Sequence, residues 1–270
     1  MGATARVERR PRTGETLGGT MSYPPAPPRI YQIDVVGQVG LAYRAVIDRA
    51  QLVGEMALLP YLIVLAIEVV ALLITHGGVY GEVLAALIRA LGFLFFGTIF
   101  IVRWHRFVLL GETVGGELLP PGWRDFVVAG LKLGAIVFAG WVALVVVALL
   151  PPYFLTIPLS ALGGVALTLL ALRVSLIFPA AAIGRPVALQ TAWEWMAGNF
   201  WRLFACAFAS FFPFIVVQML IGALASAFPS LTWIVFEALR LAVSFVGAAV
   251  IAALLSHLYR DIAPDADPSP

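Results

Sequence analysis

Long runs of apolar residues, separated by short polar segments, dominate the hydropathy pattern of this chain. A helix of roughly 20 apolar residues, at about 1.5 Å per residue, crosses the roughly 30 Å hydrocarbon core of a bilayer. The pattern therefore predicts six transmembrane helices, at about 52–74, 83–102, 126–150, 154–178, 203–225 and 231–255. Because short turns join the runs in pairs, we expect an all-α integral membrane protein built from three hairpins.

Two other segments have helical periodicity but are too polar to span. In 33–50 the apolar residues, Val36 among them, fall on one arc of a helical projection, with Leu41 as the exception. The polar residues, Gln38 among them, fall on the opposite arc, which we expect to be exposed. In 186–202 the apolar arc contains Trp193, and Glu194 lies on the polar arc. We expect both segments to be amphipathic helices in the membrane interface, the second leading without a break into the fifth span.

Composition supports the membrane class. Hydrophobic residues make up 61% of the chain and charged residues 12%, whereas soluble domains average about 25% charged residues. Residues 1–30, rich in Arg, Gly and Pro, and the acidic, Pro-containing residues 259–270 are predicted to be disordered. The folded domain is then 31–258. We expect no cleaved signal peptide, because no apolar stretch follows the first arginines.

Basic residues are distributed on one side of the predicted membrane. The turns at 75–82, 151–155 and 226–230 carry no Lys or Arg, whereas the segments 103–124 and 179–202 carry many. The positive-inside rule then places both termini and both long loops in the cytoplasm.

An interfacial helix followed by two spans occurs at 33–102 and again at 186–255, which suggests an internal repeat. Residues 192–203, Ala-Trp-Glu-Trp-Met-Ala-Gly-Asn-Phe-Trp-Arg-Leu, follow a Gly-Arg-Pro at 184–186. This stretch resembles the entry segment of bacterial six-helix inner-membrane proteins related to the membrane domain of glycerophosphoryl diester phosphodiesterases, and 33–49 looks like a divergent copy. The resemblance implies a multi-pass protein of the bacterial inner membrane. It does not imply phosphodiesterase activity, because in the namesake enzymes catalysis belongs to a separate soluble domain, for which the spans leave no room.

Four charged residues fall inside the predicted spans: Glu68, Arg89, Glu237 and Arg240. They lie roughly 9–13 Å from the predicted outer ends, a depth at which an unpaired charge is disfavoured by a few kcal/mol. Glu237 and Arg240 are spaced i, i+3 and can pair on one helix. Glu68 and Arg89 lie at matching depth on adjacent helices. One interpretation is that the four residues form a polar site or an ion path. The other is that they form two electrically neutral ion pairs that fix how the helices pack.

A second candidate site is a cytoplasmic rim of basic and aromatic residues. Its members are Arg103, Trp104, His105, Arg106, Arg124, Arg185, Trp201 and Arg202. Such a rim can bind anionic lipid headgroups, with each basic residue adding about 1 kcal/mol, or it can serve only to set the topology.

Other chemistry has little support in the sequence. The single cysteine, Cys206, and three unrelated histidines give no metal signature, and we expect no cofactor. No nucleophile–base motif or phosphate loop is present. Nucleic-acid binding is not expected, because the arginine-rich start lacks interleaved aromatics.

The leading hypothesis is therefore a non-enzymatic membrane module that organises lipids, including anionic ones, or protein partners, among them a second copy of the chain. The alternative is a transporter or permease-like protein that uses the intramembrane charges. An intramembrane enzyme is a third reading, for which the sequence assigns no catalytic residues.

Overall fold

The structure is a computed structural model, which describes residues 32–75, 78–113, 117–149, 153–228 and 233–263. The described residues are helical and contain no strand. Five helical segments among them are long and apolar enough to cross a membrane: Ala50–Thr75, Gly78–Leu110, Trp123–Val147, Phe200–Ala227 and Ile234–Ile262. The all-α class is confirmed for the described residues, and the five long apolar helices are compatible with a multi-pass membrane protein. The disorder predicted for 1–30 lies outside the described residues.

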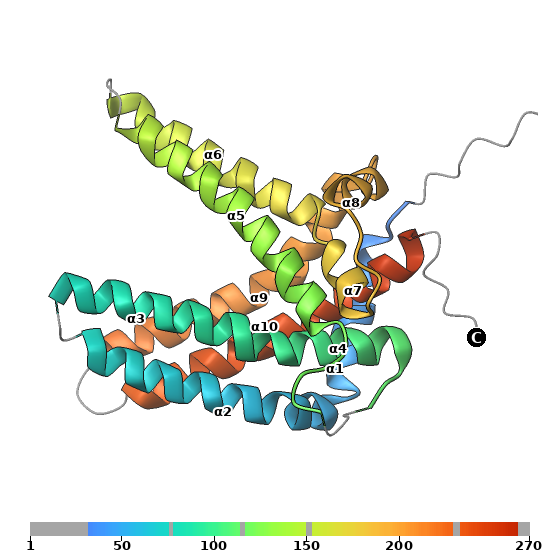
Figure 1. The fold of residues 1–270 in the computed structure, drawn as a ribbon, viewed down its shortest axis with the longest axis horizontal. Coiled ribbons are helices and arrows are strands. Elements are labelled where there is room, and N and C mark those ends of the chain that lie inside the picture. The colour runs from blue at the N-terminus through green and yellow to red at the C-terminus, as the bar shows by residue number, and fades with distance from the viewer. Residues whose placement is uncertain (1–31, 76–77, 114–116, 150–152, 229–232, 264–270) are drawn as a thin grey trace, which may run out of the picture. The chain divides into compact units, whose positions relative to one another are not determined.

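Figure 1 shows the order of the helices along the chain. They are α1 (Val35–Ile47), α2 (Ala50–Thr75), α3 (Gly78–Gly92), the π-helical turn η1 (Phe93–Gly97), α4 (Thr98–Leu110), α5 (Trp123–Ala148), α6 (Tyr153–Arg173), α7 (Ile177–Ala182), α8 (Leu189–Trp195), α9 (Phe200–Ala227) and α10 (Trp233–Ile262). The segments α3, η1 and α4 follow one another without a break and form one long helix, Gly78–Leu110. We call the end where α1, α7 and α8 gather the α1 end (Figure 1).

Helix α10 lies at the centre of the packing, in contact with α1, α2, α4, α7 and α9. Its half nearest the α1 end carries small buried residues, Ala249, Ala252, Ala253 and Ser256. Small side chains allow neighbouring backbones to approach closely, which is how helices associate in a membrane without a hydrophobic driving force between them. The largest cluster of buried residues therefore forms around this half of α10.

Helix α1 is held by hydrogen bonds as well as by apolar packing. The Tyr43 hydroxyl donates to the Ser210 carbonyl oxygen of α9 over 2.9 Å, and burial raises the pKa of this phenol. Gln38 Nε2 donates to Asp261 Oδ2 at the end of α10 over 2.6 Å. Gln38 was assigned to the polar, exposed arc, yet it is buried, whereas Val36 of the apolar arc is 83% exposed. The protein-facing side of α1 is thus rotated from the predicted one, because Gln38 has a partner on α10.

The continuous helix predicted over 186–202 is wrong. Helix α8 ends at Trp195, Gly198 adopts a left-handed conformation with φ of 78°, and α9 begins at Phe200. The Asn199 side chain between them accepts a hydrogen bond from the Ile33 backbone N–H over 3.2 Å. A glycine suited to left-handed φ and an asparagine used as an anchor turn the chain before the long helix starts.

Three predicted boundaries also change. The polar segment 103–124 is helical as far as Leu110, and the tail 259–270 is helical as far as Ile262, because residues in both stretches pack into the core. The run 154–178 is divided between α6, which ends at Arg173, and the short α7. Helix α6 contributes a shorter apolar stretch, Pro158–Arg173, to the described residues.

Helices α5 and α6 pack against each other and run away from α3 and α9 with distance from the α1 end (Figure 1). Among the described residues of α5, only Phe126 and Leu133, both in its first half, are buried. At this same end of the pair, the Arg173 guanidinium of α6 lies over the Trp193 ring of α8, 3.6 Å from its centroid. The buried contacts described for the pair therefore lie at the α1 end.

Candidate functional site: a polar cavity between α2, α9 and α10

Both pairings inferred from residue spacing are present. Arg89 Nε lies 2.7 Å from Glu68 Oε2, which joins α3 to α2. Arg240 Nη1 lies 3.6 Å from Glu237 Oε2 on α10. Charge-assisted hydrogen bonds are about 2.7–2.9 Å long, so the first pair is hydrogen bonded and the second is held by charge alone.

The structure brings three of these four residues to one cavity of about 800 Å³. Glu68, Glu237 and Arg240 all line it, together with apolar side chains of η1, α9 and α10. Arg89 is not among the lining residues. The charged set thus separates into a closed pair at the cavity edge and an open pair that faces the cavity. We call this hollow the polar cavity.

Two uncharged polar residues of the cavity were missed from the sequence. Gln218 of α9 donates through Nε2 to the Arg240 carbonyl oxygen over 2.8 Å and to Ser244 Oγ over 3.0 Å, and both Gln218 and Ser244 line the cavity. Gln218 Oε1 is buried and accepts no hydrogen bond from the described residues. An amide inside an apolar run is the signal that could have identified this position.

Arg240 is the least satisfied group of the cavity. Its side chain is 52% exposed, and that of Glu237 is 34% exposed. Among the described residues, the guanidinium makes no hydrogen bond to any side chain or carbonyl, although it carries five N–H donors. It stands only about 10 Å along α10 from Trp233, at about 1.5 Å per residue.

An apolar cavity of about 550 Å³ adjoins the polar cavity. The two share Phe93 of η1 and Ala248 and Ile251 of α10 as lining residues. The Phe93 ring also packs edge-on against Phe245, with centroids 6.4 Å apart. Single π-helical turns inside α-helices occur frequently at functional sites, and here the turn places an aromatic side chain between two cavities.

The predicted rim contains two residues that belong to the core instead. Trp104 and His105 are fully buried. The Trp104 indole Nε1 donates to the Ala249 carbonyl oxygen over 2.8 Å, and His105 Nδ1 lies 2.7 Å from Ser256 Oγ. Neither side chain can reach a lipid headgroup, because both fill the space that the small residues of α10 leave open.

Three arginines of the rim bond to the chain itself. Arg103 donates to the Glu117 carbonyl oxygen, Arg106 pairs with Glu112 at 2.7 Å, and Arg202 donates to the Ile33 carbonyl oxygen over 3.3 Å. The rim residues with exposed side chains that remain are Arg124, Arg185 and Trp201. Five of the eight predicted rim residues are thus engaged inside the protein, two in the core and three in bonds to nearby chain segments.

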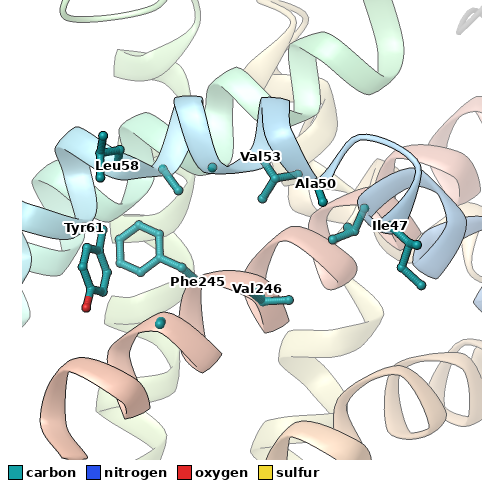
Figure 2. A pocket seen from close by; sticks show the side chains of 11 residues that line it. Ile47, Ala50, Val53, Leu58, Tyr61, Phe245 and Val246 are labelled. Carbon is teal, nitrogen blue, oxygen red and sulfur yellow. The ribbon is translucent and has the colours of Figure 1, made fainter. Parts of the chain in front are cut away.

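A third hollow is an apolar groove of about 490 Å³ between α2 and α10, near the end of α1. Figure 2 shows Val53 of α2 and Val246 of α10 on opposite sides of it, and Tyr61 beside Phe245. The Tyr61 hydroxyl donates to the Ala238 carbonyl oxygen over 3.1 Å, so its polar atom is satisfied. We call this hollow the α2–α10 groove.

No protein-family model, curated protein or solved structure matches the chain. The resemblance of 192–203 to the phosphodiesterase-related membrane proteins therefore stays a prediction. Within the described ranges, no group of three or more His, Cys, Asp or Glu side chains is arranged to hold a metal ion.

Proposed function

We propose that the chain is a multi-pass protein of the bacterial inner membrane that passes a small polar solute through the cavity between α2, α9 and α10. The observation that carries this proposal is the environment of Arg240. A half-exposed guanidinium that finds no hydrogen-bond partner among the described residues, inside a helix of span length, is stable only if water or a ligand solvates it. A water-filled cavity with charged walls is the usual arrangement for moving polar solutes.

The two ion pairs then have different roles. The Glu68–Arg89 pair is tight and fixes the packing of α3 on α2. The Glu237–Arg240 pair is open and supplies the binding groups. The two alternatives drawn from the sequence, structural pairing and a polar site, each apply to one pair.

The proposed arrangement has six spans, both termini in the cytoplasm and the α1 end at the cytoplasmic face. Helix α6 is the sixth span, because its 21 residues reach about 31 Å at about 1.5 Å per residue. The exposed side chains of Arg124, Arg185 and Trp201 then meet the cytoplasmic headgroups. The repeat of 33–102 in 186–255 is retained as part of this proposal.

Osmotic re-swelling of reconstituted vesicles tests the function. Vesicles are challenged with leucine, choline, phosphate or mannitol, which are zwitterionic, cationic, anionic and neutral, and light scattering reports the rate of entry. At least one solute should enter faster than into protein-free vesicles, and Arg240→Gln should abolish the difference. Lys132→Gln, an exposed residue of α5 outside the cavity, is the matched control. Equal rates with and without protein for all four solutes contradict the proposal.

A second candidate function is the organisation of lipids, and the α2–α10 groove favours it. The groove is lined almost entirely by apolar side chains and opens on the outer surface of the bundle, where acyl chains surround the protein. Gly54 lines it and leaves space for a side chain, since nothing lies within 4 Å of a Cβ built there. Gly54→Leu should reduce the lipid retained in native mass spectrometry, whereas unchanged retention argues against this function.

A further inference from the structure

The open pair presents a donor side and an acceptor side to the same space. Arg240 Nη1 and Glu237 Oε2 are 3.6 Å apart, beyond the range of a strong hydrogen bond, so the donors of one and the acceptors of the other remain available. Gln218 also lines this cavity, but its Oε1 is buried and not open to a ligand. A ligand that satisfies Arg240 and Glu237 together needs an anionic group and a donor-rich cationic group close together.

We propose that the polar cavity binds a zwitterion attached to an apolar body, with its anionic group on Arg240 and its ammonium group against Glu237. The inference rests on the proposed function, for which it names the class of substrate. A zwitterion fits because the lining is already neutral: Glu68 is compensated by Arg89, and Glu237 by Arg240. A simple cation or anion brings a net charge that this neutral lining does not compensate, and it can satisfy only one of the two groups, Arg240 or Glu237.

The apolar body is inferred from the neighbouring cavity. Phe93, Ala248 and Ile251 belong to the walls of both cavities, so the two are neighbours. The apolar body of a ligand anchored at Arg240 is then directed along the cavity toward Phe93 and the second, apolar space of about 550 Å³. The residues that line that space are apolar except for His105, Thr168 and Ser175. A zwitterion without an apolar part leaves this volume without favourable contacts.

Two sources share this chemistry: an amino acid with an apolar side chain, which is a small solute for the cavity to pass, and a phospholipid with a phosphoethanolamine headgroup, which occupies the site as a bound lipid. Four probes separate them in a non-ionic detergent. Leucine and lysophosphatidylethanolamine carry both features, glycine lacks the apolar body, and lysophosphatidylglycerol carries the same tail on an anionic head. Binding is measured as the shift in unfolding temperature at increasing probe concentration, and bound mass is checked by native mass spectrometry.

The expected result is tenfold or tighter binding of leucine than of glycine, or of lysophosphatidylethanolamine than of lysophosphatidylglycerol. The probe that shows the preference identifies the source. Arg240→Gln should raise its dissociation constant at least tenfold, and Arg240→Lys should raise it less, because the charge remains while the planar fork is lost. Lys132→Gln should leave it unchanged. If Arg240→Gln does not fold, the dissociation constants of wild type and Arg240→Lys are compared instead to test the proposal.

The inference is overturned if neither preference appears, or if the Arg240 variants bind the preferred probe as wild type does. These failures are distinct from failure of the proposed function. If solute entry depends on Arg240 but shows no preference for zwitterions, the proposed substrate class is wrong and the transport function stands. If a probe binds selectively but no solute enters the vesicles, the transport function is wrong and the binding site stands.

Discussion

Arg89 Nε donates to Glu68 Oε2 over 2.7 Å, and this contact joins two helices that are consecutive in the chain. Both side chains are partly shielded, with 36% and 18% of their areas exposed. In an apolar surrounding, each charge depends on the other for compensation. The contact therefore fixes the relative depth of α2 and α3, which in turn sets where Glu68 meets the polar cavity.

Glu68→Gln should destabilise the protein by about 1–3 kcal/mol, because it leaves the Arg89 guanidinium without its counter-ion. The double variant with Arg89→Gln should recover part of that loss, since both charges are then absent. The free energy of unfolding of the single and the double variant is measured by titration with sodium dodecyl sulfate, with circular dichroism as the signal. Glu82→Gln on the exposed side of α3 is the control and should behave as wild type. A double variant less stable than either single variant contradicts the assigned pairing.

Trp104→Phe should cost about 1–3 kcal/mol, because the Ala249 carbonyl oxygen loses its indole donor and the space around a fully buried ring is underfilled. The matched variant Trp201→Phe should change stability by less than about 0.5 kcal/mol, since the Trp201 side chain is 68% exposed. The same unfolding titration compares them. Equal effects at the two positions argue that Trp104 lies at the surface after all.

Gly122→Ala should be more damaging than Gly184→Ala. Both glycines have left-handed backbones, with φ of 79° and 76°, which cost a residue with a side chain about 1–2 kcal/mol. At Gly122 an added Cβ also meets the carbonyl oxygens of Ala181 and Ala182, whereas nothing lies within 4 Å at Gly184. Expression and thermal unfolding of the two variants measure the difference. Identical behaviour excludes close packing of the α5 start on α7.

Sidedness is tested with single cysteines in a Cys206→Ser background. Arg124→Cys and Arg185→Cys should react with an impermeant thiol reagent from the cytoplasmic side alone. Tyr80→Cys should react only from the other side, because Tyr80 is 91% exposed near the start of α3. Reaction of the two arginine positions from opposite sides contradicts six spans with cytoplasmic termini.

The long helices could be predicted from the sequence because hydrocarbon thickness imposes a length that apolar runs display directly. The pairing of Glu237 with Arg240 was equally accessible, since their spacing places both on one helix face. The burial of Trp104 and His105 could not be predicted from the sequence, because it depends on small α10 residues more than a hundred positions away. Their neighbours Arg103 and Arg106 made the stretch look like a surface rim.

The polar cavity was predicted only in part for a related reason. Charges inside an apolar run attract notice, whereas Gln218 carries none, and its role depends on contact with the next helix at Arg240 and Ser244. The break before α9 had a local signal in Gly198 and Asn199. The aromatic periodicity on either side of that pair outweighed the signal.

Thiol accessibility inside the bilayer tests the water-filled cavity most directly. Ser244→Cys and Leu239→Cys are made separately in the Cys206→Ser background and treated with an impermeant, charged thiol reagent in reconstituted vesicles. Ser244 lines the cavity, and Leu239 is a nearby exposed residue of α10 outside it. Modification of Ser244→Cys, with Leu239→Cys unreactive in lipid, is the predicted result. An unreactive Ser244→Cys shows that the cavity is dry and contradicts the account.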